Sequence, residues 1–304
     1  MSTGDAQGGG RTASGYLEHL GEQDLALLAG IAERLLGARP EPRRLRADPE
    51  LVERLLSDPR SFQAVLGSGR ERDPLLAASP FLVFALAVQR GASDLREAAF
   101  VGEWAGPRRR LPVFDAASLR EFLAEPARRL FLAELLASYV HVASGSVLVQ
   151  TRRGWRRQRF SELDPVRLAA LLEVVSVDMR AGVYRRLGDL ALFLTGVFPD
   201  HTATRAFAPA HADRLLRLAG LDREEARAAS VARDPGTPAG GVALLERLGR
   251  RWYRLACASA PVRTAPLAVV EEVAERFDQA RRVLNLVTDG YLMPFRNRWF
   301  PGAA

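Results

Sequence analysis

The chain has 304 residues, of which 48% are hydrophobic and 26% charged, ordinary proportions for a globular protein with a sizeable core. All 43 basic residues are arginine, so the sequence excludes chemistry that depends on a lysine amine, such as Schiff bases, the Walker P-loop and the protein-kinase lysine. The single cysteine, Cys257, excludes disulfides within the chain and Cys-x-x-Cys zinc or redox motifs.

The positive charge is concentrated in the second half of the chain. Residues 1–150 carry 18 arginines against 19 acids, whereas residues 151–304 carry 25 against 17, so the net charges are −1 and +8. The missing lysine, the single isoleucine and the two asparagines are typical of a very GC-rich genome, and codon bias explains the choice of arginine. The location of the excess favours an acidic partner for the second half.

The first hundred residues predict a leader followed by helices. Residues 1–15 are polar and rich in glycine, and we expect them to be a disordered leader. Apolar residues at helical spacing predict an amphipathic helix over 20–36. Three later helix starts combine an N-cap residue with proline in the first turn: Asp48-Pro49, Asp58-Pro59 and Ser79-Pro80. The run Phe81–Val88 is apolar nearly all round, so its helix should be buried.

Two β-hairpins interrupt this helical pattern. The first spans 99–114 around a turn at 105–107, and the second spans 147–160 around Arg153-Gly154. Residues 139–142 are a candidate third strand before the second hairpin. Between the hairpins, the sequence predicts helices over 116–124 and 126–138.

After Asp164-Pro165 the pattern is helical again. The expected helices are 183–198, 211–219, 222–229, 239–259 and 266–286, followed by an aromatic-rich tail over 291–300. We see no internal repeat and no flexible linker. We therefore predict a mainly α fold with minor β structure, as a single compact helical domain over 16–304 with two inserted hairpins.

The second hairpin has the most unusual local composition. Five arginines and two aromatic residues lie close together there: Arg152, Arg153, Trp155, Arg156, Arg157, Arg159 and Phe160. Guanidinium groups suit phosphates and aromatic rings suit stacking on bases, so the hairpin is a candidate nucleic-acid-binding element. The alternative is that the arginines only keep exposed strand edges from pairing with other chains.

A second candidate site combines histidines with carboxylates. Asp200, His201, His211 and Asp213 bring two imidazoles and two carboxylates close in sequence, and such a set could bind a divalent metal. The spacing matches no established metal motif, so we expect no bound metal and no cofactor. In the alternative interpretation, both aspartates lie near helix termini and both histidines are half-exposed.

A third candidate lies on the helix expected over 183–198. Arg185 and Asp189 are neighbours on one helical face, and a buried Asp189 would need a donor. Gly188 inside a helix costs about 1 kcal/mol relative to alanine, unless it lets another helix approach. The pattern Tyr-Arg-Arg-Leu-Gly-Asp-x-x-Leu-Phe-Leu-x-Gly-x-Phe-Pro, from Tyr184, resembles a segment of a family of uncharacterised bacterial helical proteins without an assigned activity. Helix packing is the favoured interpretation. A ligand pocket at Tyr184, Arg185 and Asp189 is the alternative.

Three further features have structural interpretations. Cys257 falls inside a helix, where a buried thiol is expected. The tail over 291–300 predicts an anchor on the protein body or, alternatively, a partner-binding segment. Six charged residues at helical spacing predict a solvated, ion-paired face: Glu271, Glu272, Glu275, Arg276, Arg281 and Arg282.

These features assemble no catalytic constellation, and no apolar run reaches the roughly 18 residues that a membrane span needs. The sequence therefore favours a non-enzymatic cytoplasmic protein that binds a partner, in the first place another protein. One alternative is a nucleic-acid-associated regulator that uses the Arg152–Arg159 hairpin. The other is an enzyme or sensor with a small-molecule or metal site near Asp189, His201 and His211.

Overall fold

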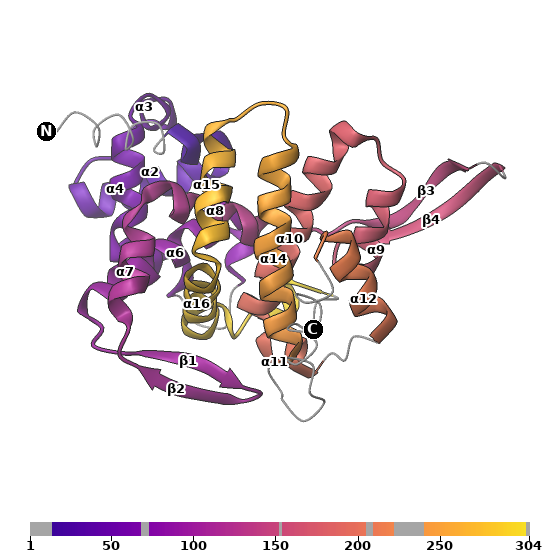
Figure 1. The fold of residues 1–304 in the computed structure, drawn as a ribbon. Coiled ribbons are helices and arrows are strands. Elements are labelled where there is room, and N and C mark those ends of the chain that lie inside the picture. The colour runs from indigo at the N-terminus through magenta and orange to yellow at the C-terminus, as the bar shows by residue number, and fades with distance from the viewer. Residues whose placement is uncertain (1–13, 68–72, 152–153, 205–208, 222–239, 302–304) are drawn as a thin grey trace, which may run out of the picture. The chain divides into compact units, whose positions relative to one another are not determined.

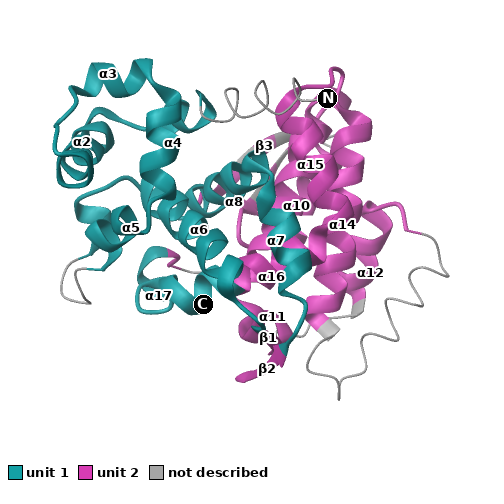
Figure 2. Ribbon diagram, turned by 90° about the vertical axis from the view of Figure 1, so that its left-hand side faces the viewer, with its two compact units in different colours: residues 1–101, 113–140, 286–299 teal, residues 102–112, 141–285, 300–304 magenta. Residues whose placement is uncertain are grey.

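The computed structural model describes residues 14–67, 73–151, 154–204, 209–221 and 240–301. The fold is mainly α-helical, with two small two-stranded sheets, as the sequence predicts (Figure 1). The chain forms two compact units (Figure 2). Unit 1 comprises residues up to 101, 113–140 and 286–299, and unit 2 comprises 102–112, 141–285 and the residues from 300 onward. A single domain over 16–304 stays a prediction.

Unit 1 is built around one central helix, α6. A helical segment over 14–19 precedes the labelled elements, so residues 14 and 15 of the expected leader are helical and the rest of it lies outside the described residues. The elements are α2 (Glu22–Leu36), α3 (Pro42–Ala47), α4 (Pro49–Ser57), α5 (Pro59–Leu66), η1 (Pro74–Leu76), α6 (Pro80–Glu97), α7 (Ala116–Ala124), α8 (Pro126–Ser138), the π-helical turn η4 (Thr288–Leu292) and α17 (Arg296–Trp299).

The expected helix starts in this unit are confirmed by their capping bonds. Asp48 accepts a hydrogen bond from the backbone N–H of Leu51 at 2.9 Å, and Ser79 accepts one from that of Leu82 at 3.2 Å. Proline occupies the first turn of α4, α5 and α6. Each cap satisfies a backbone donor that would otherwise lack a partner, so these local sequences fix where the helices begin.

The core of unit 1 surrounds α6, whose residues from Phe81 to Gln89 are all buried. Helices α4, α5, α7 and α8 pack against it. Trp299 of α17 meets Phe84 edge-on, with ring centroids 5.7 Å apart, and its indole N–H donates to Asp73 at 2.9 Å. The last aromatic residues of the unit therefore lie in its core, as the anchor interpretation of the tail expects.

Unit 2 contains the second hairpin and the helices around α10. The elements are β3 (Ser144–Thr151), β4 (Gly154–Ser161), α9 (Pro165–Ala169), η2 (Ala170–Glu173), η3 (Val177–Met179), α10 (Arg180–Val197), α11 (Pro199–Thr204), α12 (Pro209–Leu218), α14 (Gly240–Ser259), α15 (Ala265–Glu275) and α16 (Phe277–Val287). The last two residues of α16 belong to unit 1. The helix expected over 222–229 lies outside the described residues.

The first hairpin is formed by β1 (Val101–Gly106) and β2 (Arg109–Val113). Most of it belongs to unit 2, while Val101 and Val113 belong to unit 1. The candidate third strand over 139–142 is wrong: Tyr139 and Val140 form a turn after α8 and are buried. Apolar residues in a short run fit a buried turn as well as a strand, so the pattern could not separate the two.

Three glycines on α10 and α14 allow close helix packing, at contacts between these two helices and with α16. A Cβ on Gly188 would lie 2.4 Å from the Tyr253 ring, and one on Gly249 would lie 2.5 Å from the Phe277 ring. One on Gly196 would lie 2.6 Å from Leu284. The expected role of Gly188 in helix packing is confirmed by this geometry.

The single helix expected over 266–286 is wrong, because the helix is broken at Arg276 into α15 and α16. Arg276 adopts φ −108° and ψ 34°, outside the helical region. The next residue, Phe277, is fully buried against Gly249 of α14 and pairs with the Tyr253 ring at 5.9 Å. This long-range contact accompanies a bend that helical periodicity does not reveal.

Candidate functional site

The second hairpin forms a two-stranded antiparallel ribbon, residues 144–161, which we call the basic arm. Its register pairs Ser144 with Ser161 at one end and Thr151 with Gly154 at the other. Figure 1 shows the ribbon extending away from the helices of its own unit. The predicted hairpin over 147–160 is thus present, and each strand is longer than expected at the base.

The base of the arm is fixed to the helices of unit 2. Glu162 accepts a hydrogen bond from the backbone N–H of Ala143 at 2.8 Å and forms an ion pair with Arg186 of α10 at 3.2 Å. Strand β4 also packs against α9. The two strands therefore leave the helical body from a defined position, and their outer parts extend beyond it.

One face of the arm combines exposed apolar side chains with an arginine whose side chain is hydrogen-bonded to the neighbouring strand. Leu148 and Trp155 are 69% and 70% exposed. Leu148 lies opposite Arg157 in the register, and the Arg157 Nε donates to the Ser146 hydroxyl at 2.7 Å. Residues paired across strands share a face, so Leu148, Trp155 and Arg157 point to the same side.

Two other arginines of the prediction lie on the same hairpin. Arg156 pairs with Val149 and Arg159 with Ser146 in the strand register, while Arg152 and Arg153 lie outside the described residues. Sequence reasoning found the basic composition and Trp155, but not the exposure of Leu148. Alternation along the strand does place Leu148 on one face, although it does not say whether anything covers that face.

The metal candidates are not brought together. Asp200 lies in the first turn of α11 and accepts hydrogen bonds from the Trp104 indole at 2.6 Å and from the Arg108 backbone N–H at 3.2 Å. His201, His211 and Asp213 are exposed, and Asp213 lies within α12 instead of near a helix terminus. Among the residues that the structure describes, no group of three or more His, Cys, Asp or Glu could hold a metal ion. Asp200 thus holds the β1–β2 hairpin.

Asp189 lies between α10 and α14 in a packing contact. The residue is 8% exposed. Its carboxylate accepts hydrogen bonds from the Tyr253 hydroxyl at 2.9 Å and from the Arg185 Nε at 3.2 Å. Burial raises the pKa of Asp189 above its usual range, while Arg185 and the Tyr253 hydroxyl act in the opposite direction. The donor that a buried Asp189 needs is therefore supplied by two side chains.

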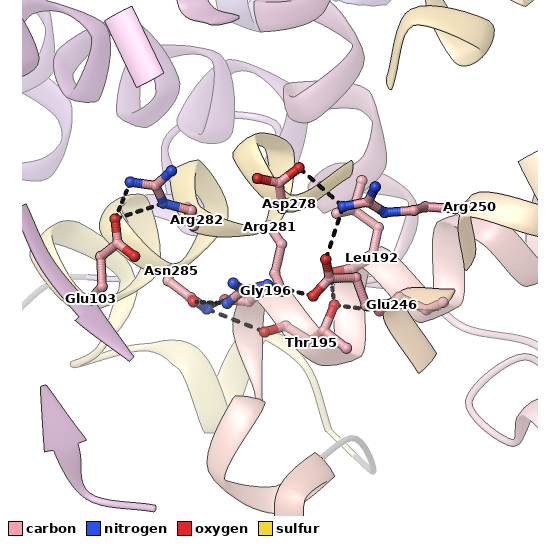
Figure 3. Close-up of polar contacts among 11 residues, drawn as sticks. Glu103, Leu192, Thr195, Gly196, Glu246, Arg250, Asp278, Arg281, Arg282 and Asn285 are labelled. Carbon is pink, nitrogen blue, oxygen red and sulfur yellow. Dashed lines mark hydrogen bonds and ion pairs between the residues drawn. The ribbon is translucent and has the colours of Figure 1, made fainter. Parts of the chain in front are cut away.

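A polar network that the sequence did not predict joins α10, α14 and α16 (Figure 3). Glu246 lies between two arginines, Arg250 at 3.1 Å and Arg281 at 3.3 Å, and Arg250 also pairs with Asp278 at 3.0 Å. Arg281 donates to the side-chain oxygen of Asn285 at 3.1 Å. Because the network connects groups on three helices, no short sequence motif predicts it.

Asn285 closes the end of α10. Its amide nitrogen donates to the backbone carbonyls of Thr195 and Gly196 at 3.2 and 2.5 Å, and Thr202 donates to that of Leu194 at 2.9 Å. The carbonyls of Thr195 and Gly196 lie in the last turn of α10, where intrahelical partners are missing, and the Leu194 carbonyl also accepts from the Phe198 backbone N–H at 3.1 Å. The role of this network is to satisfy buried polar groups at a helix end.

The solvated face expected for the charged residues near the C-terminus is wrong for two of its arginines. The side chains of Arg281 and Arg282 are only 14% and 11% exposed. Arg282 donates through Nε to Glu103 of β1 at 2.6 Å, and Arg281 pairs with Glu246 of α14 (Figure 3). Both therefore pair with distant elements, whereas helical spacing only identifies partners on the same helix.

Two further features offer little chemistry. The Cys257 thiol is half-buried, approaches the Leu267 carbonyl at 3.7 Å, and has a pKa raised by burial, which disfavours the reactive thiolate. A shallow groove of about 330 Å³ lies in unit 1 between α2 and α5. It is lined by Ile31, Arg34, Leu35, Arg60, Gln63 and Ala64, and thus by none of the pocket candidates Tyr184, Arg185 and Asp189.

Comparison with protein-family models, with curated proteins and with solved structures finds no match to this chain. None of the helices that the structure describes is both long and apolar enough to cross a membrane. The inference of function therefore depends on the chemistry of the basic arm.

Proposed function

We propose that this protein binds nucleic acid through the basic arm, by contacts between its arginines and phosphates. The observation that carries the proposal is the charge of the arm: residues 144–161 contain five arginines and no acidic residue. Residues 247–263 also contain five arginines and no acidic residue, but there Arg250 pairs with Glu246 and Asp278, and Arg263 pairs with Glu271. A sequence that concentrates arginine without acidic residues suits the phosphate backbone.

The shape of the arm supports the same partner. The arm is a narrow two-stranded ribbon that extends from the helices, and ribbons of this kind are an established means of contact with nucleic acid. An isolated two-stranded ribbon is also only marginally stable in water, so a partner that covers the arm would stabilise it.

A protein with an acidic surface is the other partner to consider, and the sequence first favoured a protein. The exposed indole of Trp155, in the same strand as Arg156 and Arg157, favours nucleic acid instead, because bases offer flat faces for stacking beside the phosphates. The proposal includes a non-enzymatic role and a cytoplasmic location, where such a partner is accessible.

The test compares two variants that each lose two positive charges. Arg156→Ser/Arg157→Ser removes them from the arm, and Arg43→Ser/Arg44→Ser removes them from exposed positions of α3. Binding to DNA and RNA is measured by fluorescence anisotropy across a salt series. The arm variant should flatten the dependence of log affinity on log salt by about 0.7–0.9 per lost phosphate contact, and the α3 variant should leave it unchanged.

Wild-type protein that binds neither DNA nor RNA at low salt would contradict the proposal. So would equal slopes for the two variants, because the charge would then act non-specifically. Binding to an acidic protein in the absence of nucleic-acid binding would restore the protein-partner interpretation.

A further inference from the structure

We infer that the face of the basic arm that carries Leu148, Trp155 and Arg157 recognises unpaired bases, so that the protein selects single-stranded over fully paired nucleic acid. This inference rests on the proposed function, because it specifies which form of nucleic acid the arm prefers. It goes beyond phosphate contact, which does not distinguish the two forms by their bases.

The arrangement of the face provides a stacking platform with a fixed charge. Trp155 is the second residue of β4 and belongs to the second-last pair of the register, so this 70% exposed residue lies toward the outer end of the ribbon. Leu148 is 69% exposed on the same face, diagonally across the register from Trp155. Arg157 lies two residues from Trp155 along β4, and the Ser146 hydroxyl holds its Nε at 2.7 Å.

The chemistry of these side chains fits base faces better than base edges. Groove readers recognise base edges with paired hydrogen-bonding groups, whereas Trp and Leu offer flat or apolar surface. In a duplex, neighbouring base pairs cover the base faces. An unpaired strand exposes them, and base–aromatic stacking then tolerates any sequence. Arg157, held beside the indole, is positioned for the phosphate next to a stacked base.

The environment of the other tryptophans makes Trp155 a usable reporter. Trp252 and Trp299 are buried, and Trp104 is half-buried with its indole N–H bonded to Asp200. A base that stacks on the arm should therefore quench mainly the fluorescence of Trp155. The quenching should disappear in Trp155→Phe, which retains an aromatic ring for binding.

The experiment measures the affinity of full-length protein for oligothymidylate and for a blunt duplex of the same length, each across a salt series. We expect wild-type protein to prefer oligothymidylate. Trp155→Ala should weaken that binding about 5- to 150-fold without changing the salt slope, and Trp155→Phe should retain most of it. Arg157→Ser should lower the slope on oligothymidylate by about 0.7.

Phe114→Ala is the matched control, because Phe114 is an 80% exposed aromatic residue directly after the other hairpin. It should leave both affinities unchanged. Equal or tighter binding to the duplex, or wild-type affinity of Trp155→Ala for oligothymidylate, would overturn this inference. If the arginine variants still flatten the salt slope in that case, the proposed function stands alone. Absence of binding to either probe at low salt would overturn both.

Discussion

Replacing Gly188 with alanine tests how closely α10 and α14 must approach. The added Cβ would lie 2.4, 2.5 and 2.9 Å from three carbons of the Tyr253 ring, so the ring must move by about 1 Å to reach ordinary contact distance. Overpacking of this kind costs about 1–3 kcal/mol, and alanine returns about 1 kcal/mol through its helix propensity. A displaced Tyr253 also loses its 2.9 Å hydrogen bond to buried Asp189, which adds about 1–3 kcal/mol.

The expected result is a decrease of about 1–5 kcal/mol in the free energy of unfolding, measured by urea denaturation with circular dichroism. Gly182→Ala is the control on the same helix, because nothing lies within 4 Å of a Cβ built at Gly182. It should leave stability unchanged or raise it by up to about 1 kcal/mol. If the Gly188→Ala variant were as stable as the Gly182→Ala variant, or more stable, the reasoning would be refuted, since the Tyr253 ring would then have free space.

Three more outcomes follow from polar contacts. Asp200→Ala should speed amide hydrogen exchange over 101–113, because the carboxylate that accepts from the Trp104 indole and the Arg108 backbone N–H is lost; unchanged exchange would contradict its role. Asn285→Leu should cost about 1–3 kcal/mol in urea denaturation, because two buried carbonyls lose their donor. The hydrogen bond to Glu134 raises the pKa of His19, so that bond stabilises the fold below about pH 6.5 and its contribution is lost as the pH rises through the folded-state pKa. His19→Gln should therefore lower the free energy of unfolding more at low pH than at high pH, and the difference should be less than about 1 kcal/mol at this exposed site. Equal losses of stability at low and high pH would contradict this prediction.

The sequence determined the local structure of this protein well, because the signals for helix starts and turns act over a few residues. Asp48, Asp58 and Ser79 cap helices at the predicted positions, since each side chain bonds a backbone N–H two or three residues ahead. The apolar run from Phe81 marks the buried helix of unit 1, and the basic composition of the arm is visible without any structure.

The tertiary structure decided which distant groups meet. Asp189 needed a donor, but only the packing of α10 against α14 supplies Tyr253, which is 64 residues away. Arg281 and Arg282 could have paired along their own helix, and the fold pairs them with Glu246 and Glu103 instead. Periodicity reports which face of a helix is apolar. It carries no information about which helix covers that face, because the contact depends on the path of the whole chain.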